Sequence, residues 1–214
     1  MNTAIAPRKI AEKPWTFALG VGIVRNANLI RMQGRNKMKA WYFSSEDRKL
    51  RYGDNRIIKA GLTHKVTCKP VLCEAGLHGS KRIIDALSYA PGPIVWRVEL
   101  GGDMAIGDDK ISATERHYLW GFDATDVLRR FARKCALDVI HLWDAPDVVV
   151  RYLKTGDENL RDAASDAASD AASAAAWAAA RDAAWDAAWA ATSDAAIKKQ
   201  NNRLTSMIIA TRRK

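Results

Sequence analysis

Cysteine is scarce in this chain, and its spacing excludes the usual metal and redox patterns. Cys68, Cys73 and Cys135 are the only three among 214 residues. Four residues separate Cys68 from Cys73, which suits neither a zinc knuckle nor a CxxC pair. We therefore expect reduced cysteines, no bound metal and a cytoplasmic location.

Long apolar runs are also missing. The stretch WTFALGVGIV at residues 15–24 follows basic residues, as in a signal peptide. Arg25 comes directly after it, however, and no small-residue cleavage site precedes that arginine. A membrane-spanning helix needs ~20 apolar residues. The sequence therefore predicts a soluble protein without a membrane partner.

Glycine and proline do not occur after residue 156. This last part contains a tetrapeptide repeat at residues 162–197, DAAS DAAS DAAS AAAW AAAR DAAW DAAW AATS DAAI. Because alanine is the best helix former, we expect a helix from residue 157 to about 210, ~80 Å long if it is straight. Thr155 and Glu158 have the spacing of a capping box at its start.

Positive charge is concentrated at the two ends of the chain. The formal net charge is +10; residues 1–37 hold seven Lys or Arg against one Glu, and residues 198–214 hold six against no acid. Basic ends bind polyanions such as nucleic acids through counterion release. They are also typical of solubilising tails, so both interpretations stay open.

The part before the repeat has the pattern of an α+β domain with a small mixed or antiparallel sheet. Short strands are expected near residues 39–44, 56–59, 64–68, 71–74, 93–100, 104–106, 110–114 and 117–121. Three helices are expected. One starts from an N-cap at Ser80, one starts near Asp123 or Thr125, and one opens after Asp144 with Pro146 in its first turn and stops at Gly156.

Three segments follow from this pattern. Residues 1–37 form a basic arm, with Met38 as an alternative start of the protein. Residues 38–155 form the α+β domain. Residues 156–214 form a long Ala-rich helix, or a helical hairpin that turns near KKQNNR.

The large side chains of the repeat fall on one arc of the expected helix. At about 100° per residue, Trp185, Trp189 and Met207 lie close together, with Trp177 at the edge of the arc. Trp is a typical interface anchor, so the arc predicts a protein partner or self-association. Two alternatives stay open: the helix packs back on its own domain, or it is an ice-binding or spacer helix.

The order of motifs resembles an uncharacterised family found in phages and prophages. The motifs are CEAGLHGSKRIIDALSYAPGPIVWRVEL, DDKISATERHYLWGFDATDVLRRFA and HLWDAPDVVVRYLKTGDENLRDAA, followed by the Ala/Trp repeat. The resemblance covers about residues 38–206. It implies a phage-type accessory protein in a bacterial cell and brings no assigned activity.

GLHGSKRIIDALSYA followed by IVWRVELGG also resembles ADP-ribosyltransferases, especially poly(ADP-ribose) polymerases. The resemblance implies NAD as a cofactor, Tyr89 in the place of the tyrosine that stacks on nicotinamide, and Glu115 in the place of the catalytic glutamate. Two features depart from the family: Ala86 stands where a serine binds the carboxamide, and the first-strand His-Gly is absent near AWYFSS. A fold of this type with a degraded site is what the resemblance implies.

His78 is the main candidate for chemistry, because it lies two residues before the expected helix N-cap. A helix start with His78, Ser80 and Lys81 suits a phosphate or a nucleotide. The alternative is that Ser80 only caps the helix. A hydrolase built on Cys73 and Glu74 is disfavoured, because the sequence does not place them beside His78.

The expected helix after Asp123 carries a basic face that would suit nucleic-acid phosphates, or simply solvent. Its members are Arg129, Arg130, Arg133 and Lys134.

The sequence thus predicts a non-enzymatic binding or assembly module that acts through its Ala/Trp helix and needs no cofactor. The first alternative is an NAD-dependent ADP-ribosyltransferase, with His78 and Glu115 as catalytic residues and Ser80, Lys81 and Tyr89 binding the cofactor. The second alternative is a nucleic-acid binder.

Overall fold

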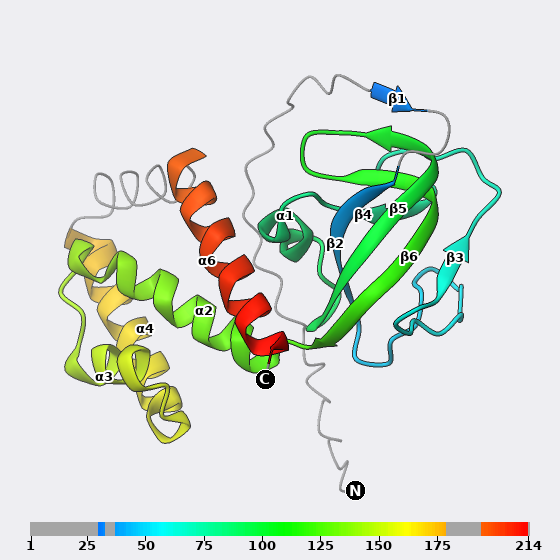
Figure 1. Cartoon of the computed structure of the whole chain (residues 1–214). Coiled ribbons are helices and arrows are strands. Elements are labelled where there is room, and N and C mark those ends of the chain that lie inside the picture. The colour runs from blue at the N-terminus through cyan, green and yellow to red at the C-terminus, as the bar shows by residue number, and fades with distance from the viewer. Residues whose placement is uncertain (1–29, 33–36, 179–193, 214) are drawn as a thin grey trace, which may run out of the picture.

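The computed structural model is an α+β fold built on one long β-hairpin (Figure 1). It describes residues 30–32, 37–178 and 194–213. The strands are β1 (Ile30–Met32), β2 (Met38–Ser44), β3 (Thr63–Lys65), β4 (Leu77–Gly79), β5 (Ile94–Ile106) and β6 (Ile111–Asp123). The helices are α1 (Ile83–Ser88), α2 (Thr125–Asp138), α3 (Asp147–Thr155), α4 (Arg161–Ala178) and α6 (Asp194–Arg212), with short 3-10 turns η1 (Ile140–Leu142) and η2 (Glu158–Leu160).

The hairpin of β5 and β6 organises the sheet, because every other strand pairs with one of these two. Each of the two strands has thirteen residues. β2 and β1 pair antiparallel along β5, and β4 and β3 pair antiparallel along β6. The sequence predicted four shorter strands over the same length of chain. The register of β5 and β6 shifts between Gly101 and Met104, which accounts for the gap expected at residues 101–103. Gly102 has a φ of +71° there, and a Cβ at this position would collide with the Thr114 side chain.

The sheet curls until its two sides meet. Trp41 on β2 and Ser80, just after β4, exchange backbone hydrogen bonds of 2.7 and 2.9 Å. The curled sheet encloses a core of alternate β5 side chains, Trp96, Val98 and Leu100, each at most 2% exposed. Alternation along the strand points these residues to one face and Val95 to the other.

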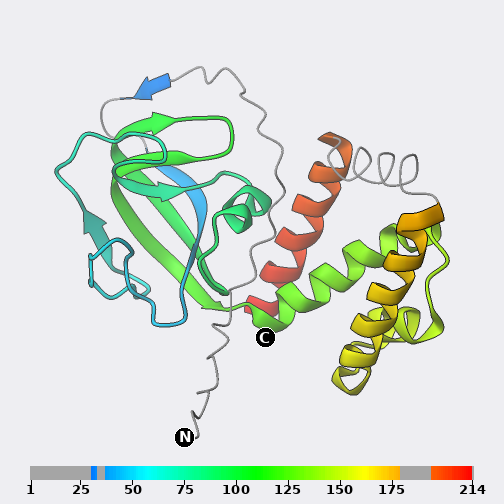
Figure 2. The same ribbon diagram turned by 180° about the vertical axis from the view of Figure 1, so that it is seen from behind.

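Helices α1, α2 and α6 cover the outer face of the sheet (Figures 1 and 2). Phe43 and Val95 of the sheet pack there with Phe131 of α2 and with Leu204 and Ile208 of α6. Both α6 residues are completely buried. The C-terminal helix therefore packs back on its own domain, which was one of the open alternatives.

The two described helices of the repeat do not lie on one straight axis. α4 packs against α3 and η2, whereas α6 packs against α1 and α2, and the two helices have different axes in both views (Figures 1 and 2). No hairpin turns at residues 198–203 either, because α6 is continuous there. Residues 179–193 lie outside the described residues.

The predicted starts and ends of the other helices are confirmed in part. α2 begins at Thr125, and α3 has Pro146 as its N-cap and Gly156, with a φ of +70°, after its last residue. The capping box of Thr155 and Glu158 is wrong: Asp157 accepts a hydrogen bond from the Asn159 backbone N–H and caps η2 instead.

The N-cap of α1 is not Ser80, contrary to the prediction from the sequence. Ser80 lies in the bridge to Trp41, and α1 begins only at Ile83. The backbone N–H groups of Ile83 and Ile84 donate to Asn201 Oδ1 of α6, at 3.0 and 3.5 Å. The cap therefore comes from a residue more than a hundred positions away in the chain.

Three further segments differ from the expected organisation. At residues 56–59 only an isolated bridge between Ile57 and Lys49 forms in place of the expected strand. Residues 30–32, inside the expected basic arm, pair as β1 with the end of β5. The strand expected at residues 71–74 is a turn, closed by a bridge between Val71 and Ala75, in which Cys73 has a φ of +65°.

Replacing Asn201 by Ala should lower the free energy of unfolding by about 1 kcal/mol, the usual cost of losing an N-cap. Asn202→Ala is the matched control, because Asn202 is exposed on the same helix, and Asn201→Asp should retain the cap because it keeps an acceptor. Urea denaturation measures all three. Equal effects of Asn201→Ala and Asn202→Ala would contradict the cap.

Candidate functional site

A groove of about 830 Å3 opens between β2, β4, α1 and β6. We call it the central groove. Small-molecule sites in proteins typically measure roughly 300–1,000 Å3, so its size suits an organic ligand. Its charged and polar lining includes Arg51, Asp54, Glu74, His78, Ser80, Tyr89, Lys110 and Arg116.

Arg116 is the most deeply buried charge of the groove, with 2% of its surface exposed. It lies on β6 in the inward-facing phase of the strand, two residues before Tyr118. Its Nη1 donates to the backbone carbonyl of His78 at 2.6 Å, and its Nε donates to the Tyr118 hydroxyl at 2.9 Å. The guanidinium carbon lies 3.7 Å from the centre of the Tyr42 ring.

No carboxylate of the described residues forms an ion pair with Arg116. Its two hydrogen bonds use Nε and Nη1, so within this part of the chain Nη2 remains for a ligand. An uncompensated buried charge costs several kcal/mol. The groove therefore contains a cation that lacks its counter-charge.

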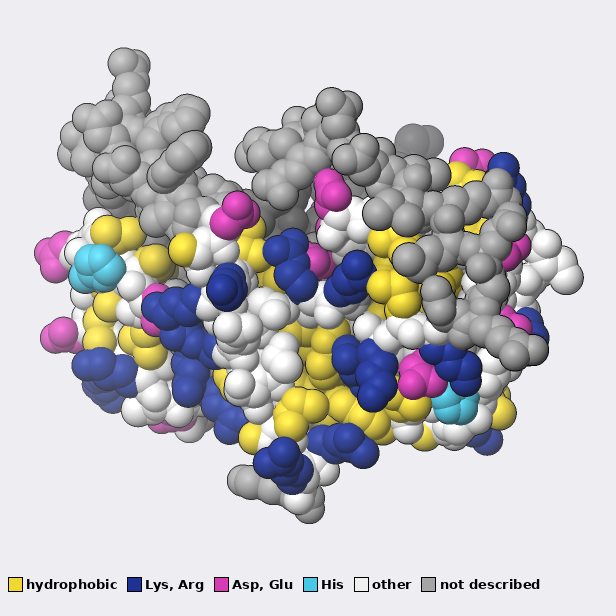
Figure 3. Space-filling view, turned by 45° about the horizontal axis from the view of Figure 1, so that its top comes forward, with side chains coloured by type: hydrophobic (Ala, Val, Ile, Leu, Met, Phe, Trp, Pro, Cys, Tyr) yellow, Lys and Arg dark blue, Asp and Glu magenta, His cyan; other side chains and the backbone are white. Residues whose placement is uncertain are grey.

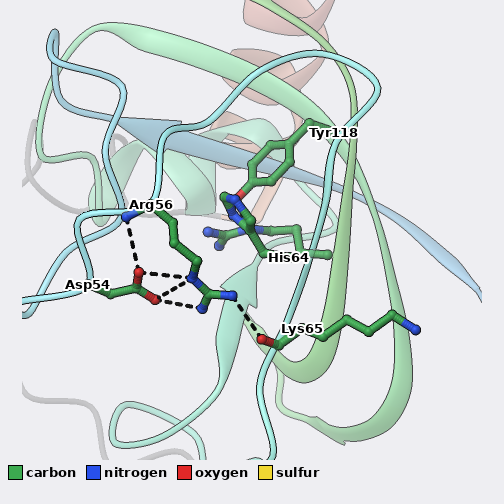
Figure 4. Close-up of polar contacts among 6 residues, drawn as sticks. Asp54, Arg56, His64, Lys65 and Tyr118 are labelled. Atoms are coloured by element: carbon green, nitrogen blue, oxygen red, sulfur yellow. Dashed lines mark hydrogen bonds and ion pairs between the residues drawn. The ribbon is translucent and has the colours of Figure 1, made fainter.

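A buried network behind the groove holds Arg116 in place. The Tyr118 hydroxyl accepts from Arg116 Nε at 2.9 Å. It also lies within hydrogen-bond distance of His64 Nδ1, at 3.1 Å (Figure 4). Burial lowers the pKa of His64, and the neighbouring Arg56 and Arg116 lower it further. His64 is therefore neutral at neutral pH.

Arg56 lies close to this network and has a carboxylate as its ion-pair partner. Its guanidinium grips both carboxylate oxygens of Asp54, with the shortest contact at 2.6 Å, and it also donates to the Lys65 carbonyl at 3.0 Å (Figure 4). Hydrogen bonds from Arg56 lower the pKa of Asp54. Arg116 has no such carboxylate partner among the described residues. The two neighbouring arginines therefore differ in whether a carboxylate compensates their charge.

His78 is half-buried in the wall of the groove, on β4. Burial lowers its pKa, and the charge of Lys110 lowers it further, against backbone hydrogen bonds at Val71 and Gly76 that raise it. The Nε2 atom is buried without a hydrogen-bond partner in the described part of the chain. His78 is therefore a neutral imidazole with one unused nitrogen.

Lys110 and Tyr89 form the other end of the groove. The Lys110 ammonium lies 3.4 Å from the centre of the Tyr89 ring and 3.2 Å from Cys73 Sγ, and the Tyr89 hydroxyl donates to Asp109. Burial acts to lower the pKa of Lys110, but its hydrogen bonds to Cys73 and Tyr89 raise it overall. Lys110 is thus a second, fully charged cation of the site.

The structure brings some predicted site residues together and separates others. Ser80 and Tyr89 line the groove with His78, whereas Lys81 is exposed and does not line it. Glu115 lies outside the groove and pairs with Lys65 at 2.7 Å.

Strand register explains the position of Glu115. His78 lies opposite Ser112 on β6, and Glu115 is three residues further along that strand. An odd spacing places the two residues on opposite faces of the strand. His78 and Glu115 therefore do not form one catalytic site in this structure.

The predicted nucleic-acid face of α2 is partly used for contacts within the protein. The Arg133 guanidinium packs over Gly156, and the Lys134 carbonyl accepts from Arg203 of α6 at 3.3 Å. Arg129 and Arg130 are exposed. Lys and Arg side chains gather over the helical part of the face in Figure 3, and nucleic-acid binding there stays a prediction.

The structure describes the side chain of only one member of the predicted interface arc, Met207. Trp185 and Trp189, and the side chain of Trp177, lie outside the described residues, and assembly through them stays a prediction. Met207 packs against the protein's own helical core. In the described ranges, no group of His, Cys, Asp or Glu side chains is arranged to hold a metal ion, and no helix is long and apolar enough to cross a membrane.

Sequence reasoning missed Arg116, Lys110 and Tyr42. The alternation along β6 does indicate a buried position for Arg116, because residues two apart on a strand point to the same face, and Tyr118 points inward. Lys110 lies in the turn between β5 and β6 and left no comparable signal.

Stability should fall as the pH is lowered from 6.5 toward 5. The folded-state pKa values of His64 and His78 are lowered below the ordinary value of 6.5, so the unfolded chain binds more protons in this window. Their contribution is present above pH 6.5 and is lost as the pH falls. Asp54 has a pKa below 3.8, so its contribution to the pH dependence of stability lies at lower pH than this window.

Urea denaturation at pH 7.5, 6.5 and 5.5 measures this effect. His64→Gln and His78→Gln should each flatten the dependence, whereas His141→Gln, at an exposed position, should not. An unchanged midpoint in the wild type across this range would contradict the lowered pKa values of His64 and His78 in the folded state.

The comparisons with known proteins add one match. A family described as "Domain of unknown function (DUF7666)" matches residues 58–130, which include His78, Tyr89, Lys110 and Arg116. No curated protein and no solved structure matches the chain. Over this stretch the chain is similar to a family without an assigned activity.

Proposed function

We propose that this protein is a binding module whose central groove takes a small organic anion with a flat ring, such as a nucleotide. The observation that carries the proposal is Arg116, which is 2% exposed and lines the groove without a carboxylate partner among the described residues. A ligand anion would supply the missing counter-charge.

The geometry of an arginine suits this role. A guanidinium binds phosphate or carboxylate through parallel N–H donors, and Arg116 is fixed by Tyr42, Tyr118 and the His78 carbonyl, so that little side-chain entropy is lost on binding. Lys110 adds a second positive charge at the other end of the groove.

The balance of charge in the groove also favours an anion. Arg51, Lys110 and Arg116 line it together with Asp54 and Glu74. Asp54 is already neutralised by Arg56, at 2.6 Å. The charges that remain in the lining, three basic side chains and Glu74, are therefore positive in sum.

Aromatic and apolar side chains supply a surface for a ring. Tyr42 and Tyr89 line the groove, and Tyr52, 93% exposed, lies at its edge. Leu50 and Leu77 add apolar wall. Flat ligands stack on such rings, and each base–aromatic stack contributes roughly 1–3 kcal/mol in nucleic-acid binding proteins.

Binding is favoured over transfer chemistry because of where the acidic groups lie. Glu115, the expected catalytic glutamate, faces away from the groove and pairs with Lys65. Glu74 is an exposed lining residue. The groove thus presents cations and rings to a ligand, and the expected catalytic glutamate, Glu115, is not among its lining residues.

Nucleoside monophosphates should bind the wild type, and the matching nucleosides should bind much more weakly, because only the nucleotides carry the anion. Arg116→Gln should lower the affinity for nucleotides by roughly 30-fold or more. It should also lower the free energy of unfolding by about 1–3 kcal/mol, because the His78 carbonyl loses its donor. Calorimetric titration at a temperature where the variant is folded measures the affinity.

Arg130→Gln is the matched control for the loss of one positive charge, since Arg130 is exposed on α2 outside the groove. It should leave the affinity unchanged. Equal losses in the two variants, or equal binding of nucleosides and nucleotides, would contradict a groove built around Arg116.

A further inference from the structure

Each Lys or Arg side chain in the lining of the central groove lies beside a tyrosine ring that also lines the groove. The three pairs are Arg116 with Tyr42, Lys110 with Tyr89, and Arg51 with Tyr52. The distance from the charged group to the ring centre is 3.7, 3.4 and 5.1 Å in the same order. The groove therefore contains the same arrangement, a cation beside a ring, three times.

None of these three cations forms an ion pair with a carboxylate of the described residues. Basic residues just outside the lining do have such partners. Arg56 pairs with Asp54 at 2.6 Å, and Lys65 pairs with Glu115 at 2.7 Å. A single phosphate would supply the counter-charge of Arg116 and leave the other two cations of the lining uncompensated.

The positions of Lys110 and Arg116 along the chain keep these two cations apart. Lys110 directly precedes β6, and Arg116 follows six residues later on the same strand. At the rise of a β-strand, their Cα atoms are about 20 Å apart. Side chains stand roughly perpendicular to a sheet, and each charged group is held on a different ring. The lining therefore extends beyond the reach of one phosphate group.

The rings of the three pairs are accessible to a ligand. Tyr52 is 93% exposed and Tyr89 is 46% exposed, and Tyr42 is partly exposed. Proteins that bind single-stranded nucleic acids combine a positively charged groove, which follows the phosphates, with aromatic side chains on which the bases stack. A duplex does not fit this arrangement, because its bases are already stacked on one another inside the helix.

We infer that the ligand of the central groove is a short single-stranded nucleic acid, whose successive phosphates lie on the cations and whose bases stack on the tyrosines. The inference rests on the proposed function and extends it from one nucleotide to a chain of two or three. Because every base has a face that can stack, the groove would bind such a strand with little sequence preference.

The dependence of affinity on strand length tests the inference. AMP and the 5′-phosphorylated adenylates pApA and pApApA are titrated into the full chain by calorimetry. We expect the affinity to rise by roughly fivefold or more with each added nucleotide, the effect of one base–aromatic stack. ATP is the matched control, because it carries nearly the same charge as pApApA at neutral pH but only one base, and it should bind more weakly than pApApA. The deoxyribose forms are titrated in parallel, and the tighter series identifies the strand as RNA or DNA.

Tyr52 is the ring to replace, because its high exposure means that little packing is lost. Tyr52→Leu should lower the ratio of the affinities for pApApA and AMP by roughly fivefold. Trp143→Leu removes an exposed aromatic ring outside the groove and should leave this ratio unchanged.

The outcomes separate the inference from the proposed function. If pApApA binds no more tightly than AMP, or no more tightly than ATP, the single-strand ligand is overturned and the anion site at Arg116 stands. Equal ratios in Tyr52→Leu and Trp143→Leu would also overturn it, because the added nucleotides would then lie elsewhere. If AMP and the longer adenylates all fail to bind, both proposals are overturned.

Discussion

The buried guanidinium of Arg116 joins three strands of the sheet through one planar group. It projects from β6, donates to the backbone of β4 at His78 and stacks on the Tyr42 ring of β2. These strands form the wall of the central groove, so the wall is shaped by a charge that has no carboxylate partner among the described residues. The network through Tyr118 and His64 fixes the orientation of that charge. The site and the fold therefore depend on the same contact.

The helical layer supports the groove from the other side. α1, which contributes Ala86 and Ser88 to the lining, is too short to be stable alone. It is held by the Asn201 cap and by the buried Leu204 and Ile208 of α6. The C-terminal helix is thus part of the domain. The repeat begins and ends on the protein's own surface, in α4 packed on α3 and in α6 packed on α1 and α2.

Local signals in the sequence were enough for the elements that are stabilised locally. The period of α2, the end of α3 at Gly156 and the alternation of the first part of β5 are confirmed, because their causes lie within a few residues. Contacts between distant residues were not predictable in this way. The cap of α1 comes from Asn201, and the arm contributes β1 through pairing with β5.

The candidate site was predicted only in part for the same reason. His78, Ser80 and Tyr89 lie near one another in the sequence and do share the groove. Arg116 and Lys110 join them through strand pairing, and Glu115 is excluded by the register of β6. A shift of one residue would reverse the faces of that strand. Register of this kind is visible only once the strands are paired.

The most direct test of the central claim follows Arg116 itself. NMR spectra of protein with nitrogen-15-labelled arginine resolve side-chain Nε–Hε signals, which can be followed while AMP is added at constant ionic strength. The account predicts that the Arg116 signal shifts and saturates at one ligand per chain, while Arg130 on α2 stays unchanged. A stationary Arg116 signal, with exposed arginines that drift in proportion to AMP concentration, would contradict it.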